Sequence, residues 1–114
     1  MTTLYHLAEQ ADWADAQAAG IYQRSTRGVS LAEQGFIHCS LRHQVRGIAD
    51  LLFADVDGVL LLVIDADRVP APIRYEAAAP GGDEYPHIYG PLPLDAVTAA
   101  IPLRRDAAGT LLLP

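Results

Sequence analysis

Short stretches in which apolar and polar residues alternate recur along this chain, and they predict strands. The run from Val59 to Ile64 is apolar at every position, so we expect it to be a central strand with both faces covered. The other expected strands span residues 4–8, 36–40, 73–77, the middle of 85–92, 97–103 and 110–113. Loops are expected at residues 21–28, 65–72, 80–84 and 106–109, where polar residues, glycines and prolines gather.

Two segments have the composition or spacing of helices. Asp12 is a good N-cap for a short alanine-rich helix from Trp13 to Ala19, which Gly20 would end. From Leu41 to Ala54 apolar residues recur at helical spacing, which predicts the main amphipathic helix, and Ser40 stands where its N-cap is needed. A single helical turn is expected between them, because Ser-Leu-Ala-Glu at 30–33 has capping-box spacing.

The order of these elements indicates the fold class. The helices lie early in the chain and most strands late, which is typical of α+β proteins with small, mostly antiparallel sheets. With 114 residues, and neither an internal repeat nor a linker, we expect residues 1–114 to form a single domain. A hydrophobic content of 51% and a charged content of 19% are ordinary for a globular protein.

Charge and cysteine content narrow the classes of partner. A net charge of −6 disfavours binding to nucleic acid, although a local pocket for a small phosphate-bearing ligand stays compatible with it. The single cysteine, Cys39, excludes an intrachain disulfide. The N-terminal residues lack the features of a signal peptide, and the longest strongly apolar run is too short to cross a bilayer. We therefore expect a cytoplasmic protein that does not contact membranes.

The segment Tyr85–Leu92 is the strongest candidate for a binding surface. If its middle is extended, Tyr85, His87 and Tyr89 point to one side, because side chains alternate along a strand. Such a face presents hydrogen-bonding groups on aromatic rings, which suits a ligand with rings and hydroxyls. The alternative is a strand end between proline-rich turns, with its rings half buried.

Other polar residues on predicted strands are further candidates. His6 and His38 are two of them, but the long, unpatterned spacing of the histidines disfavours a metal site. Glu76 is the one carboxylate within an apolar and aromatic strand, where it serves either chemistry or an exposed ion pair with Arg74 on the same face. Cys39 is expected in the core. Neither a dinucleotide-binding glycine motif nor a Walker loop is present.

The segments Gly35–Ser40, followed by Gln44, and Tyr85–Leu92 resemble those of the bacterial proteins of domain-of-unknown-function family 952. Further segments fall in the same order as in that family, namely Tyr5-His6, the Trp13 helix, Leu60–Asp65 and Arg74-Tyr75-Glu76. The resemblance covers essentially the whole chain, and its two main motifs are specific.

This resemblance implies more about fold than about activity. The family is grouped by remote similarity with ADP-ribosyltransferase-like domains, which hold NAD between two small sheets. By that analogy, His6 corresponds to a histidine on the nicotinamide-side ribose, Tyr22 or Tyr89 to a tyrosine on the nicotinamide, and Glu76 to the glutamate that helps break the glycosidic bond. The resemblance makes NAD a candidate cofactor and no cofactor certain.

Together these observations predict one cleft with Glu76 at its edge. The side chains expected to line it, all polar and most of them on predicted strands, are His6, Tyr22, His38, Ser40, Gln44, His87 and Tyr89. One function is a module that binds a nucleotide-like ligand without turning it over. The other is an NAD-dependent ADP-ribosyltransferase or glycohydrolase, with Glu76 and His6 as catalytic residues. The module is favoured, because Arg74 offers the single candidate acid a structural role. A monomer or a weak homodimer is expected, since Leu111–Leu113 suit either a dimer contact or the core.

Overall fold

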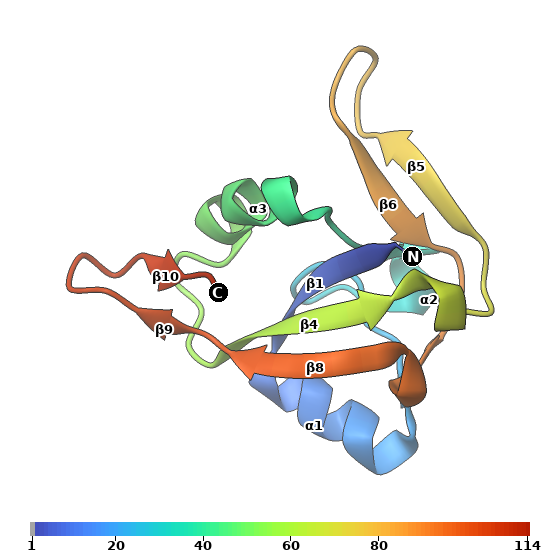
Figure 1. Ribbon diagram of the computed structural model, residues 1–114, viewed down its shortest axis with the longest axis horizontal. Helices are drawn as coiled ribbons and strands as arrows, with labels where there is room; N and C mark the ends of the chain where they lie inside the picture. Colours follow the sequence, from blue (N-terminus) through green and yellow to red (C-terminus); the bar gives the residue numbers. More distant parts are fainter. Residues whose placement is uncertain (1) are drawn as a thin grey trace.

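The computed structural model describes residues 2–114, and its centre is a three-stranded antiparallel sheet (Figure 1). Strand β4 (Val59–Asp65) lies between β1 (Thr3–Glu9) and β8 (Val97–Pro102). The β1–β4 register runs from Thr3 opposite Asp65 to Glu9 opposite Val59. The continuous apolar run of β4 therefore occupies the central position that the sequence predicts.

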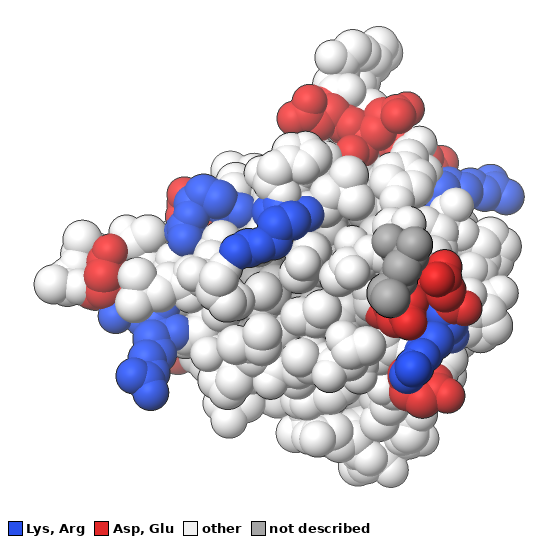
Figure 2. All heavy atoms as spheres, viewed as in Figure 1, with Lys and Arg blue, Asp and Glu red and all other residues white. Residues whose placement is uncertain are grey.

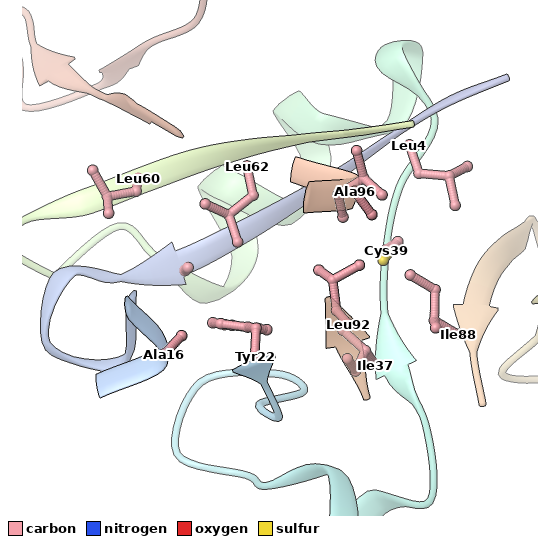
Figure 3. Close-up of a cluster of buried hydrophobic side chains, with 12 residues drawn as sticks. Leu4, Ala16, Tyr22, Ile37, Cys39, Leu60, Leu62, Ile88, Leu92 and Ala96 are labelled. Atoms are coloured by element: carbon pink, nitrogen blue, oxygen red, sulfur yellow. The ribbon is translucent and has the colours of Figure 1, made fainter. Parts of the chain in front are cut away.

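The two faces of β4 contribute to two different hydrophobic clusters. Leu60, Leu62 and Ile64 face a cluster that includes residues of β1, α1 and the short strands beyond (Figure 3). Val59 and Leu61 lie in a second cluster, with Val45, Ala49 and Phe53 from the region of α3. Because both faces of the sheet are covered at β4, the side chains on both faces of this strand are apolar.

The helices are close to the predicted positions but begin elsewhere. Helix α1 (Gln10–Ala19) begins directly after β1, so Glu9 and not Asp12 is its N-cap. Asp12 lies in the first turn, where a negative charge is favourable, and it pairs with Arg24 at 3.5 Å. Helix α2 (Leu31–Gln34) is the predicted single turn, with both hydrogen bonds of its capping box formed.

The main helix is shorter than predicted. A 3₁₀ turn at Arg42–Gln44 leads into α3 (Val45–Leu52), so the helical pattern over 41–54 overestimates the α-helix at both ends. Ser40 is not its N-cap, since the backbone of Ser40 pairs with that of Tyr5 on β1. The Leu41 N–H group is satisfied instead by Oε1 of the Gln44 side chain, at 2.9 Å.

A second antiparallel sheet carries most of the candidate residues. Strand β6 (Glu84–Ile88) pairs with β3 (Ile37–His38) on one side and with β5 (Ile73–Ala77) on the other. The β5–β6 hairpin projects away from the central sheet, on the same side as α3 (Figure 1). Tyr75, in the middle of β5, is 44% exposed, because only the base of this hairpin packs on the core.

Two short ladders complete the α+β fold. Strand β2 (Ile21–Tyr22), within a segment predicted as a loop, pairs with β7 (Leu92–Pro93). Strand β9 (Arg104–Arg105) pairs with β10 (Leu111–Leu112). Further 3₁₀ turns lie at Ala66–Arg68 and Leu94–Ala96. Leu111 is buried while Leu112 is half exposed, so the C-terminal leucines divide between core and surface. Within residues 2–114 we find no helix long and apolar enough to span a membrane.

Candidate functional site

A cavity of about 530 Å³ lies between α3 and the β5–β6 hairpin. Its wall is aromatic on the side of the second sheet and aliphatic on the side of α3. Twelve residues line it: Thr26, Gln34, Phe36, His38, Ile48, Leu51, Glu76, Ala77, Ala78, Tyr85, His87 and Tyr89. The second sheet thus places residues distant in sequence around one opening.

Glu76 is the polar centre of this wall. Its Oε1 atom accepts a hydrogen bond from Nδ1–H of His87, at 3.0 Å, and another from the Tyr89 hydroxyl. These two contacts hold down the pKa of the Glu76 carboxyl, the Tyr89 hydroxyl contributing more than His87. The hydrogen bond to Glu76 in turn raises the pKa of Tyr89. Glu76 is therefore an ionised carboxylate at neutral pH, and His87 and Tyr89 both hold it through its Oε1 atom.

Two acceptor atoms of this group are left open. Among residues 2–114, no side-chain nitrogen or oxygen is both buried and without a hydrogen-bond partner. Oε2 of Glu76 and Nε2 of His87 have no hydrogen-bond partner among these residues, so both atoms are accessible to a ligand. When His87 is neutral, the proton stays on Nδ1 and Nε2 is an acceptor.

Aromatic contacts fix the orientation of the His87 ring. Phe36 stacks on it with centroids 3.9 Å apart and planes 13° from parallel. Tyr89 lies 5.4 Å from Phe36, and the Arg74 guanidinium lies 5.0 Å from the centre of the Tyr89 ring. No ion pair joins Arg74 to Glu76 among the described residues, so the pairing of these two residues that the sequence suggested is wrong.

His38 forms the second imidazole of the wall. Its ring lies 5.0 Å from Tyr85 and 5.4 Å from His87, between centroids. Burial, and secondarily the neighbouring His87, lower the pKa of His38 to about 4. His38 is therefore neutral at pH 7. Its ring nitrogens make no hydrogen bond within residues 2–114 and are accessible, so it offers one donor and one acceptor.

His6 and Tyr22 form a buried layer behind this wall. Nδ1–H of His6 donates to the carbonyl oxygen of His38 at 2.6 Å, and the Tyr22 hydroxyl donates to Nε2 of His6 at 2.8 Å. Burial lowers the pKa of His6 to about 4 and raises that of Tyr22, so both groups are neutral. Because both nitrogens of His6 are occupied, this pair supports the strand that carries His38 and does not reach the cavity.

The two remaining candidates also lie outside the cavity wall. Ser40 is buried at the β1 bridge, beside a void of about 10 Å³ that His6 and His38 share. Gln44 is buried, and its Nε2–H donates to the carbonyl oxygen of Glu84, at 2.8 Å, where β6 begins. Gln44 thus holds the start of β6 close to α3, which positions the hairpin wall.

The structure brings together half of the predicted group. His38, Glu76, His87 and Tyr89 line the cavity, whereas His6, Tyr22, Ser40 and Gln44 lie behind it. Sequence reasoning missed the α3 wall: Ile48 lies on the predicted apolar stripe, and Leu51 lies off it. Leu51 is 76% exposed, and the sequence does not distinguish it from an ordinary leucine on the surface of a helix. No group of potential metal ligands gathers anywhere in residues 2–114.

Comparison with known proteins identifies the family. The family described as "Protein of unknown function (DUF952)" matches residues 7–100. The crystal structure of protein CC0527 from Caulobacter crescentus is 33% identical, with a TM-score of 0.84 over 98% of this chain and 95% of that one. Its solution structure, also 33% identical, gives a TM-score of 0.76 over 96% and 91% of the two chains. No curated protein matches. The chain therefore belongs to the DUF952 family of proteins of unknown function.

Proposed function

We propose that the cavity between α3 and the β5–β6 hairpin binds a small nucleoside-like ligand. The observation that carries this proposal is the ionised Glu76, held by His87 and Tyr89 within an aromatic wall. A flat base fits against aromatic side chains, and sugar hydroxyls fit open hydrogen-bonding atoms such as Oε2 of Glu76 and Nε2 of His87.

The dimensions and chemistry of the cavity support this class of ligand. Its volume of about 530 Å³ falls within the range of about 300–1,000 Å³ typical of small-molecule sites. Ile48 and Leu51 supply an apolar surface opposite the rings. Among the lining residues that the structure describes there is no arginine, so the phosphates of a nucleotide would extend outside the cavity. The base and sugar are therefore the parts that we propose are recognised.

A second function rests on Glu76 itself. An ADP-ribosyltransferase-like fold would place NAD with its nicotinamide-side ribose near a carboxylate. Glu76 is ionised, and its Oε2 is open. In a glycohydrolase reaction the bond from C1′ to the nicotinamide nitrogen breaks, its electron pair stays with nicotinamide, and water adds to C1′ and loses a proton. A fixed carboxylate stabilises the oxocarbenium character that develops at C1′. The ribose contact implied for His6 does not fit this site, because His6 is buried with both nitrogens occupied.

An amide-shift NMR titration tests the first proposal. Adenosine, nicotinamide riboside, NAD and ADP-ribose are added separately, and we expect saturable shifts concentrated at residues 36–38, 48–51, 76–78 and 85–89. His87→Ala should weaken binding at least fivefold, whereas His43→Ala, on the exposed side of the 3₁₀ turn, should leave it unchanged. Absence of shifts at millimolar concentration with all four compounds would refute the proposed function.

Nicotinamide release separates the two functions. If the protein is a glycohydrolase or transferase, NAD yields free nicotinamide, and Glu76→Gln abolishes the release while the variant still binds NAD. If NAD binds and is recovered intact, the function as an NAD-cleaving enzyme is excluded and the function as a binding module stands.

A further inference from the structure

The charges around the cavity are uneven. Glu76 is the only acidic or basic side chain, histidines aside, among the twelve that line the cavity as the structure describes it. His38 adds no positive charge at pH 7, because its pKa is about 4. The space-filling view shows a group of acidic side chains on the adjoining β5–β6 hairpin (Figure 2). The same view shows basic side chains over α3, so the negative charge lies on the hairpin side of the opening (Figure 2).

One oxygen of the Glu76 carboxylate is available to contact a ligand. Both contacts that the carboxylate makes with the described part of the chain fall on Oε1, and within that part Oε2 is free and accessible. Tyr89 and His87 also lower the pKa of Glu76, so the negative charge persists at neutral pH. A buried or half-buried carboxylate with an open oxygen gains most from a partner of opposite charge.

The rings of the wall complete the arrangement. The faces of tyrosine and phenylalanine are negative in electrostatic potential and attract cations. Arg74, which does not line the cavity, lies over the Tyr89 ring at 5.0 Å from its centre, so one ring of this group already contacts a cation. Tyr85 and Phe36 bring two further rings to the same opening. Aromatic rings beside one carboxylate form a site that suits an organic cation better than a neutral molecule of the same shape.

From this arrangement we infer that the cavity selects ligands whose ring is positively charged, such as an N-alkylated pyridinium. The inference rests on the proposed function and specifies its ligand: the base of the nucleoside-like molecule is a cation. The positive ring lies against the aromatic wall and close to Oε2 of Glu76, while Ile48 and Leu51 cover its apolar edge.

A matched pair of probes tests the inference. 1-Methylnicotinamide is a cation, and 3-methylbenzamide is its neutral counterpart, with carbon in place of the ring nitrogen and the same outline. Dissociation constants from amide-shift titration are expected to favour the cation roughly tenfold, the size of a partly desolvated cation–aromatic contact. In Glu76→Gln, which keeps an acceptor for His87 and Tyr89, the preference should fall to about twofold or less, with the amide spectrum confirming the fold.

A second carboxylate provides the control. Glu84→Gln removes an exposed acid that belongs to the same hairpin but does not line the cavity, and it should leave the tenfold preference within a factor of two. A preference below twofold in the unmodified protein, or a preference that survives Glu76→Gln unchanged, would overturn the inference. If adenosine binds while the two amides bind equally or not at all, the inference fails and the proposed function stands. If none of these compounds binds, both fail.

Discussion

Nδ1–H of His87 on β6 donates a 3.0 Å hydrogen bond to Oε1 of Glu76 on β5. The two residues are not directly opposite, since Glu76 pairs with Tyr85 and His87 with Arg74. They are diagonal neighbours on one face of the hairpin, a distance that long polar side chains can span. The hairpin register therefore creates the carboxylate–imidazole pair, and Tyr89, one residue beyond β6, adds its hydroxyl to the same oxygen.

The Tyr89 hydroxyl is expected to hold the pKa of Glu76 below its ordinary value. Tyr89→Phe removes the largest contribution to the lowered pKa of Glu76, so this pKa should rise towards its ordinary range. Carboxyl-carbon NMR of Glu76 against pH measures the change directly. Tyr85→Phe is the matched control, because no hydrogen bond between the Tyr85 hydroxyl and Glu76 is formed in residues 2–114. An equal rise in both variants would contradict the assignment.

The buried pair of His6 and Tyr22 should contribute to stability. Tyr22→Phe leaves Nε2 of His6 as a buried acceptor without a donor, which we expect to lower the free energy of unfolding by about 1–3 kcal/mol. Urea denaturation monitored by circular dichroism gives the value. Tyr75→Phe removes a hydroxyl from a half-exposed ring and should change stability by less than about 0.5 kcal/mol. Equal effects of the two substitutions would show that the hydrogen bond contributes nothing.

Acid should destabilise the fold before most carboxylates titrate. The pKa of His6 falls from 6.5 to about 4 on folding because of burial, so the unfolded chain binds the proton more tightly. The stabilisation is complete above pH 6.5 and is lost as the pH falls towards 4, with a slope approaching about 1.4 kcal/mol per pH unit for one group. His38 titrates in the same direction. Unfolding free energies between pH 7.5 and 5 test the slope, and a ring-carbon titration of His6 with a midpoint above 6 would contradict it.

Two glycines should respond in opposite ways to alanine. A Cβ atom at Gly90 would lie 2.7 Å from Cβ of Ala71, so Gly90→Ala forces the two loops apart and should cost about 1–3 kcal/mol. At Gly47, inside α3, no described atom beyond the neighbouring backbone of the helix lies within 4 Å of the added Cβ. Gly47→Ala should therefore stabilise by about 0.5–1 kcal/mol through its helix propensity. Thermal denaturation of both variants measures the change in stability. A stabilising effect of Gly90→Ala would contradict the close approach of Gly90 to Ala71.

The core strands could be predicted because the order of apolar and polar residues along each strand shows which of its faces are buried. The apolar run of β4 indicated a strand covered on both faces, and the capping box of α2 identified a single turn with both bonds formed. The start of α1 was misplaced because Asp12 satisfies the same preference in the first turn as at the N-cap. The start of α3 was misplaced because Gln44 caps the Leu41 N–H group as the N3 residue of a capping box does, while Leu41 itself is not a residue that marks an N-cap.

The candidate site could be predicted only in part. Alternation along a strand shows on which face a side chain lies, but not whether that side chain is buried in the core or lines a cavity. The alternation along β6 placed His87 on a polar face, and the structure agrees. His6 lies on a strand of the central sheet, and the sequence contains no indication that His38 would be folded over it. Leu51 was missed because its place in the cavity wall depends on the hairpin opposite α3, a relationship between segments far apart in the chain.

The most direct test of the central claim is the measurement of intermolecular NOEs in a complex with nicotinamide riboside. The proposed function predicts contacts from the pyridinium ring protons to the methyl groups of Ile48 and Leu51 and to the ring protons of Tyr85. Contacts to ligand protons found only at another part of the surface, such as the hollow beside Asp12 and Arg24, would contradict it.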